Sequence, residues 1–205
     1  MFSLIKTKTY IGILTLLLGV FSVHAQDSET PSGYEITPYF GYMFGPEIGD
    51  GNGGDIDISD DAHLGLAFSW RDSPNGQGQI LINYVSHDFD NPSDGGKEDL
   101  NVLYTHFNGV AEFRDGNYVT TFSIGLGGAY IDTDYESEIF PSATLAVGTR
   151  YEFTPFFAMF TEIRGYATYT DEDDETFCRD DVCIAEFDDA IYYDTSISVG
   201  LAFAF

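Results

Sequence analysis

The sequence has few basic residues. It contains 8 Lys and Arg against 34 Asp and Glu, which gives a formal net charge of −26 at pH 7. This balance excludes a nucleic-acid-binding protein, because contacts to phosphates need Lys and Arg. Long apolar runs are also scarce, and none after the first 25 residues approaches the roughly 20 residues of a membrane-spanning helix. Aromatic residues, in contrast, are abundant at 16% of the chain, and this excludes a disordered protein.

The first residues differ from the rest of the chain. Two lysines precede an apolar run over residues 10–23, and a Val-His-Ala sequence ending at Ala25 offers a small-residue cleavage site. These features predict a secretory signal peptide over residues 1–25. The remainder, residues 26–205, is long enough for one domain.

The last segment of the chain has the clearest periodicity. From Ile191 to Phe205, large apolar side chains alternate with small or polar ones. A period of two indicates an extended strand with two unlike faces. The strand is longer than most strands of soluble proteins, and its length suits a tilted strand that crosses a bilayer. Aromatic residues at both ends of its apolar face match the interfacial girdles of transmembrane barrels.

The same alternation recurs along the chain, and the connections between its segments are alternately short and long. The segments are 34–44, 62–71, 79–87, 100–113, 118–131, 140–153, 156–169 and 191–205. The long connections are 45–61, 88–99, 132–139 and 170–189, and they hold 25 of the 34 acidic residues. This pattern predicts an all-β fold, an eight-stranded antiparallel up-and-down transmembrane β-barrel. Short connections belong on the periplasmic side of such barrels and long ones outside, so we expect both termini in the periplasm.

A soluble barrel of the lipocalin kind is the structural alternative. It would place the large apolar side chains inside. Here the opposite face consists mostly of Gly, Ala, Ser and Thr, which suits a narrow lumen filled by its own side chains. We therefore expect the apolar face to contact lipid. The segment 79–87 is the least regular, because Leu81 and Val85 lie opposite the apolar face formed by Ile80, Ile82 and Tyr84.

Several stretches resemble a known family. They are Glu162–Ala167, the Cys178 and Cys183 pair in an acidic loop, Ser198–Phe205, Ile36–Tyr42, Leu64–Trp70 and Gly125–Gly128. Together they resemble the small Gram-negative outer-membrane β-barrel proteins, a group that includes the OmpA transmembrane domain and OmpW. The resemblance implies an eight-stranded barrel in the outer membrane and a terminal residue, Phe205, recognised by the barrel-assembly machinery. It implies no reaction.

Cys178 and Cys183 are the only cysteines. In a loop that faces an oxidising exterior we expect them to form a disulfide, which would stabilise the loop by roughly 2–3 kcal/mol. The alternative is a metal site shared with Asp180 and Asp181, although no His lies nearby.

Several charged residues fall on the inward faces of the predicted strands. They are Glu112, Arg150, Glu152, Glu162, Arg164 and Asp194. Charges at membrane depth need partners. Glu162 and Arg164 share one face but are two residues apart, so we expect each to pair with a neighbouring strand. The set is either a structural ion network that fills the lumen or a gate in a narrow conduit.

The acidic loops offer oxygen ligands for Ca²⁺ or Mg²⁺. The candidates are Asp50, Asp55, Asp57, Asp171, Asp173 and Asp174. Their spacing does not match an EF-hand loop. The alternative is a solvated anionic surface that divalent cations bridge to lipopolysaccharide phosphates. We expect no other cofactor.

Enzyme chemistry on such a barrel would need a Ser and a His at the lipid-facing surface or the rim. His63 and His106 are predicted to point inward, whereas His87 lies beside Ser86 and Asp88 at a loop edge. We expect no enzyme, and instead a structural or interaction role with an acidic extracellular crown. The alternatives are a narrow pore for small solutes and, more remotely, a lipid A-modifying enzyme. The expected partners are outer-membrane lipid, lipopolysaccharide and the assembly machinery, with the protein a monomer.

Overall fold

The structure is a computed structural model that describes residues 33–49, 55–91, 95–133, 137–170, 178–179, 182–183 and 191–205. The predicted signal peptide lies outside these residues, as do Asp50, Asp171, Asp173 and Asp174. The long strands are β1 (Tyr34–Phe44), β4 (Asp61–Ser73), β5 (Gly76–Asp90), β6 (Lys97–Asp115), β7 (Tyr118–Thr133), β8 (Ser137–Thr154), β9 (Phe157–Tyr169) and β12 (Ile191–Ala204). The short strands are β2 (Glu47–Gly49), β3 (Asp55–Asp57), β10 (Cys178–Arg179) and β11 (Val182–Cys183).

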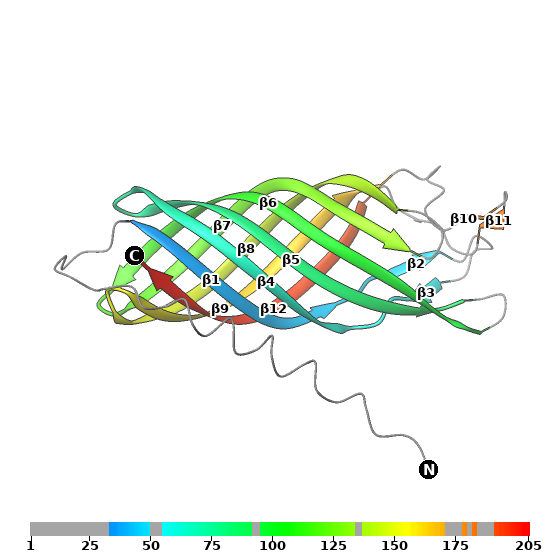
Figure 1. The fold of residues 1–205 in the computed structure, drawn as a ribbon, viewed down its shortest axis with the longest axis horizontal. Helices are drawn as coiled ribbons and strands as arrows, with labels where there is room; N and C mark the ends of the chain where they lie inside the picture. Colours follow the sequence, from blue (N-terminus) through cyan, green and yellow to red (C-terminus); the bar gives the residue numbers. More distant parts are fainter. Residues whose placement is uncertain are drawn as a thin grey trace, which may run out of the picture. The chain divides into compact units, whose positions relative to one another are not determined.

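The eight long strands form a closed barrel in the order β1-β12-β9-β8-β7-β6-β5-β4 (Figure 1). Each strand pairs antiparallel with its neighbours, and β1 closes the barrel by pairing with β12, where Tyr39 lies opposite Gly200. This confirms the predicted eight-stranded antiparallel barrel. Closure leaves no strand edge unpaired, as backbone in hydrocarbon requires. Among the described residues, no helix is long and apolar enough to cross a membrane.

The two ends of the barrel differ. One end, here called the turn end, holds the three short turns, the start of β1 and the end of β12 (Figure 1). At one of these turns Gly116 has a φ of +63°, a backbone conformation that the Asp-Gly hairpin uses. The other end, here called the loop end, holds β2, β3, β10 and β11 (Figure 1).

The faces of the strands follow the sequence pattern. Large apolar side chains point out of the barrel, and Leu126 is 73% exposed. Ile197, Leu201 and Phe203 on β12 are exposed in the same way, so they do not form a protein core. On β12 the inward positions are small, polar or aromatic, among them Tyr192, Asp194, Ser196, Ser198 and Ala202, as the predicted narrow lumen requires.

Aromatic residues border the apolar belt at both ends. At the loop end these are Tyr42, Tyr84, Tyr130, Tyr169 and Tyr193, and at the turn end they include Tyr34, Trp70, Phe113, Tyr118, Phe153 and Phe205. Two of the loop-end tyrosines donate hydrogen bonds from their hydroxyls to residues outside the belt. Tyr42 donates to the Asp60 carbonyl at 3.0 Å, and Tyr84 donates to Asn101 Oδ1 at 2.7 Å. From Tyr118 to Tyr130, β7 extends roughly 40 Å along the strand. At a tilt of about 40° this is roughly 30 Å, the thickness of a bilayer core.

Beyond the tyrosines of the loop end the barrel continues, and there its inside is apolar. The buried residues at this end are Met43, Val85, Phe89, Leu100, Val102, Ile131 and Phe140, joined by Ile56 and Ile58. This explains half of the irregularity in segment 79–87: Val85 points inward just beyond Tyr84, where the strand runs on into water and an apolar core must be inside. Leu81 also points inward but lies within the belt, opposite His106 of β6. It also corrects the predicted loops 88–99 and 132–139, whose ends are strand.

The segment after β3 covers this apolar core. Ile58 donates its backbone N–H to the Pro46 carbonyl at 3.0 Å, and Ser59 donates to the Asp88 carbonyl at 2.8 Å. The Asp88 N–H in turn donates to Ser59 Oγ at 2.7 Å. These bonds hold Ile56 and Ile58 in the mouth of the barrel.

Candidate functional site in the barrel lumen

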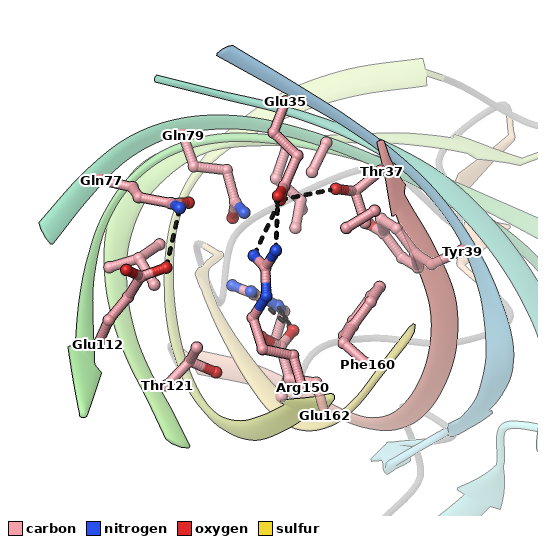
Figure 2. Close-up of a pocket in the computed structure, with 15 residues that line it drawn as sticks. Glu35, Thr37, Tyr39, Gln77, Gln79, Glu112, Thr121, Arg150, Phe160 and Glu162 are labelled. Carbon is pink, nitrogen blue, oxygen red and sulfur yellow. Dashed lines mark hydrogen bonds and ion pairs between the residues drawn. The ribbon is translucent and has the colours of Figure 1, made fainter. Parts of the chain in front are cut away.

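A cavity of about 50 Å³ lies inside the barrel near the turn end (Figure 2). Its polar lining includes Glu35, Gln77, Glu112, Arg150, Glu162 and Arg164, and Tyr39 and Phe160 line it on one side. A water needs roughly 10–15 Å³ of such space, so the cavity has room for about three to five waters. It is too small for an organic solute.

An ion pair crosses the lumen at this cavity. Arg150 on β8 donates to both carboxylate oxygens of Glu35 on β1, at 3.2 and 2.8 Å (Figure 2). Thr37 donates its hydroxyl to the same carboxylate at 3.2 Å. β12 and β9 separate β1 from β8 around the wall, so the pair joins two distant strands. Bidentate geometry of this kind is the strongest form of an Arg–carboxylate contact.

A second charged group lies at the turn end around Glu112. Its carboxylate accepts from Arg114 at 2.7 Å and from Gln77 at 2.9 Å, and Arg71 lies 3.6 Å away. Arg114 also donates to Glu152 at 2.8 Å. Glu112 and Glu152 were predicted to lie in the lumen, whereas Arg71 and Arg114 were not, because these two lie where strands end in turns.

Glu162 and Arg164 pair with each other. Arg164 Nε lies 2.9 Å and its terminal nitrogen 2.8 Å from Glu162 Oε1. The expectation of a partner on a neighbouring strand is therefore wrong for Glu162 but holds for Arg164, which also bonds to Thr144 on β8. Side chains on one face lean along the strand, and the long Arg side chain spans the two-residue step. Arg164, 2% exposed, also donates to Thr144 at 3.1 Å and to Ser123 at 3.4 Å.

Asp194 lies apart from the arginines. It accepts a hydrogen bond from the Tyr104 hydroxyl, and Tyr104 stacks on Tyr166 with ring centroids 4.2 Å apart. The His106 ring lies 5.9 Å from Tyr104 and 5.7 Å from Tyr166. Asp194 is therefore part of an aromatic layer in mid-lumen, not of the ion network. This layer was not predicted, although alternation places Tyr104 and Tyr166 on inward faces and could have indicated it.

His63 has partners on both ring nitrogens. Nδ1 lies 2.7 Å from Asn83 Oδ1, and Nε2 lies 3.2 Å from Ser198 Oγ. A serine, a histidine and an orienting amide are the elements of a nucleophilic triad. Ser198, however, is 6% exposed and does not line the cavity. The arrangement fits a structural chain of hydrogen bonds between buried polar groups.

The second candidate arrangement, His87 with Ser86 and Asp88, does not form. His87 is buried and its Nδ1 lies 2.6 Å from the Ser59 carbonyl oxygen, whereas Ser86 and Asp88 are exposed on the opposite face of β5. A period of two forces this separation, because adjacent strand residues point to opposite faces.

The predicted metal and disulfide residues lie largely outside the described side chains. Asp57 is exposed, and within the described part of the chain no group of three or more His, Cys, Asp or Glu could hold a metal ion. The backbone pairs Cys178 directly opposite Cys183 across β10 and β11. Their side chains are not among those described, so the disulfide stays a prediction.

Two further contacts lie at opposite ends of the barrel. At the turn end the Phe205 ring stacks on Tyr34 with centroids 6.3 Å apart, and its N–H donates to the Tyr34 carbonyl at 3.0 Å. At the loop end Lys97 pairs with Asp90 at 2.9 Å. This hydrogen bond raises the pKa of Lys97 above its ordinary value.

The barrel is similar to solved structures of outer-membrane proteins. It aligns with OprG from Pseudomonas aeruginosa at a TM-score of 0.56 and 11% identity, over 86% of this chain and 97% of that one. The fold is that of the small outer-membrane β-barrels. Neisserial surface protein A aligns at a TM-score of 0.55 and 11% identity, over 86% of this chain and all of that one. Outer membrane protein W of E. coli aligns at 0.53 and 11%, over 87% and 100%. No family model and no curated protein matches the sequence. Identities this low establish the fold and no function.

Proposed function

We propose that this protein is a non-enzymatic outer-membrane barrel whose lumen is closed to solutes and whose role is structural or is an interaction made by its loop end. The observation that supports this is the filling of the lumen along its length. Ion pairs occupy the turn end, an aromatic layer the middle and an apolar core the loop end.

Passage of a solute would disrupt each of these layers. Tyr104 and Tyr166 are fully or almost fully buried, stacked on each other and hydrogen-bonded to Asp194 and Asn83. Moving them aside would leave buried polar groups without partners, at about 1–3 kcal/mol for each group. Beyond them, Ile56 and Ile58 fill the mouth.

The proposed interaction surface is the loop end. Its described exposed residues include Asp57, Asp60, Asp88, Asp90 and Asp99. A surface of this sign favours cationic partners, or anionic ones bridged by divalent cations. Since long connections of such barrels face the outside medium, we place this end outside the cell, where lipopolysaccharide is the nearest abundant partner.

The small conduit is the second candidate, and the charged cavity at the turn end is the feature that favours it. Planar-bilayer recording separates the two functions. We expect no steady conductance from the wild-type protein, and openings only from a Tyr104→Ala, Tyr166→Ala double variant, which lacks the aromatic layer. Steady wild-type channels that Arg164→Gln alters would overturn the closed lumen in favour of the conduit.

The absence of enzyme activity needs its own measurement. Lipid A from expressing cells should have the same mass as lipid A from cells without the protein. A mass change that Ser198→Ala abolishes would show instead that the Ser198–His63–Asn83 arrangement is catalytic.

A further inference from the structure

The apolar belt is not equally wide on all sides of the barrel. On β7 its outward face runs over Tyr118–Tyr130. On β5 it ends at Tyr84, because the next outward residue, Ser86, is polar and exposed. On β4 it ends toward the turn end at Trp70, because the next outward residue is the exposed Asp72. These two strands form the side here called the narrow wall, whose exposed apolar residues are Leu64, Leu66, Phe68, Ile80, Ile82 and Tyr84.

The register gives the height of each residue along the barrel axis. Followed once around the barrel, the row of paired residues that begins at Phe113 on β6 returns to β6 at Leu103, ten residues nearer the loop end. With about 3.3 Å per residue and about 4.8 Å between strands, the strands are tilted by about 40°. One residue along a strand therefore changes the height by about 2.5 Å. One step along a row, in the direction from β4 through β5 and β6 to β7, moves about 3 Å toward the loop end.

Both borders of the narrow wall lie nearer the middle of the belt than the borders of β7 do. Tyr84 and Tyr130 lie in one row, two strands apart, so Tyr84 is about 6 Å nearer the turn end. The row of Trp70 reaches β7 at Ile124, six residues from Tyr118, so Trp70 is about 6 Å nearer the loop end than Tyr118. The belt therefore measures roughly 18 Å on the narrow wall and roughly 30 Å on β7.

The directions of the tyrosine side chains do not remove this difference. The Tyr84 hydroxyl donates to Asn101, and the Tyr130 hydroxyl lies 3.5 Å from Asp132 Oδ1. Each partner lies two residues beyond the row of its tyrosine, toward the loop end. Both rings therefore point the same way along the axis, and their hydroxyls keep the difference in height between the two strands.

A tilt of the whole barrel cannot fit this belt to a bilayer of constant thickness. Tilting shifts both borders of one wall in the same direction, whereas the borders at Tyr84 and Trp70 are displaced toward each other. In a bilayer core about 30 Å thick, these two rings would each lie about 6 Å inside the hydrocarbon, away from the interface that amphipathic rings prefer. A hydrophobic span shorter than the bilayer core is accommodated by local thinning of the bilayer.

We propose that the narrow wall thins the bilayer beside β4 and β5 and gathers membrane lipids with short acyl chains there. Lipid is the occupant because every outward residue between the borders at Trp70 and Tyr84 is apolar or glycine, so the wall offers no side-chain hydrogen bond to a protein partner. The proposal rests on the barrel spanning a bilayer and is independent of whether the lumen is closed.

Fluorescence quenching tests the proposal in vesicles of dioleoylphosphatidylcholine that contain an increasing fraction of dilauroylphosphatidylcholine brominated on its shorter chains. The reporter is Ile82→Trp on β5. The matched reporter is Ile163→Trp on β9, on the opposite side of the barrel, where Ile163 is 53% exposed against 43% for Ile82. Both carry Trp70→Tyr, which leaves a single tryptophan and keeps an amphipathic ring at the border. We expect half-maximal quenching of Ile82→Trp at a roughly threefold lower fraction of the brominated lipid.

Lengthening the narrow wall decides whether its width causes this preference. Ser86→Leu combined with Asp88→Leu extends the apolar face of β5 by about 10 Å along the axis and should remove the preference. The control combines the same two changes at the loop-end border of the wide side, where Asp132 pairs with Ser137. Asp132→Leu with Ser137→Leu should leave the preference intact. Heat-modifiable mobility on gels shows that each variant has folded.

Three results would overturn the proposal. Equal quenching of the two reporters would mean that the bilayer is equally thick on both sides of the barrel. A preference that survives Ser86→Leu with Asp88→Leu would have a cause other than the width of the wall. Protection of Ile82→Trp from brominated lipids of both chain lengths, together with cross-linking of two copies through β4 and β5, would make a second copy the occupant.

Discussion

Tyr104 and Tyr166 stack across the lumen with their ring centroids 4.2 Å apart and their planes 21° from parallel. They come from β6 and β9, which are separated by β7 and β8 around the wall. The stack therefore fixes the distance between two distant parts of the barrel, and its buried rings fill the lumen at the same point.

Removing one ring of this stack should destabilise the barrel. Tyr166→Ala leaves a cavity between Tyr104 and His106, and large aromatic-to-Ala changes in buried sites cost about 3–5 kcal/mol. Urea unfolding from lipid vesicles measures the free energy of unfolding. Tyr104→Phe, which keeps the ring and loses only the bond to Asp194, is the control and should cost about 1–3 kcal/mol. Equal losses in the two variants would contradict the assigned role of the stack.

The ion pair between Glu35 and Arg150 should contribute measurably to stability. A double-mutant cycle with Glu35→Gln and Arg150→Gln isolates its coupling energy. Because both side chains are mostly buried and the geometry is bidentate, we expect a coupling of about 1–3 kcal/mol. The exposed pair of Lys97 and Asp90 is the comparison and should show little coupling. No coupling at Glu35 would mean that the cavity water solvates both charges.

The outward face should tolerate charge only near the ends of the belt. Leu126→Arg or Ile197→Arg should lower the free energy of unfolding by roughly 2–4 kcal/mol, because these residues lie near the bilayer midplane. Ile139 pairs with Tyr130 at the level of the loop-end tyrosines, so Ile139→Arg should cost only about 0–1 kcal/mol. If Leu126→Arg and Ile139→Arg fold equally well, the belt does not lie where the aromatic residues place it.

The cysteines of the longest loop should be linked. Cys178 lies directly opposite Cys183 in the register of β10 and β11, and a secreted chain meets oxidising conditions. Alkylation of the denatured protein followed by mass spectrometry should add no label without a reductant and two labels after reduction. One or two labels on the unreduced protein would show free thiols and would favour another role for the pair.

Much of the fold follows from periodicity. Alternation from Ile191 to Phe205 assigned the lipid-facing side of β12 correctly, because a strand has only two faces and a bilayer allows only one of them to be apolar. Strand ends were less predictable. The predicted segments 79–87 and 100–113 stop near the membrane surface, whereas β5 and β6 continue beyond it with apolar side chains inside.

The sequence predicted which charged residues point into the lumen, but it did not predict which of them contact one another. Glu112, Arg150, Glu152, Glu162, Arg164 and Asp194 all lie on strand faces that the period of two identifies. Which of them meet depends on strands far apart in the chain: 115 positions separate Glu35 from Arg150, and Asp194 lies beside Tyr104 rather than an arginine.

The sequence by itself determined the strand number, the two faces of each strand and the separation of acidic connections from an apolar belt, because these are local properties of alternation and composition. Only the tertiary structure decided that Glu35 meets Arg150 and that Tyr104 and Tyr166 stack across the lumen. The reason is geometric: closure of the barrel sets which inward residues face each other, and register sets which outward residues form one surface.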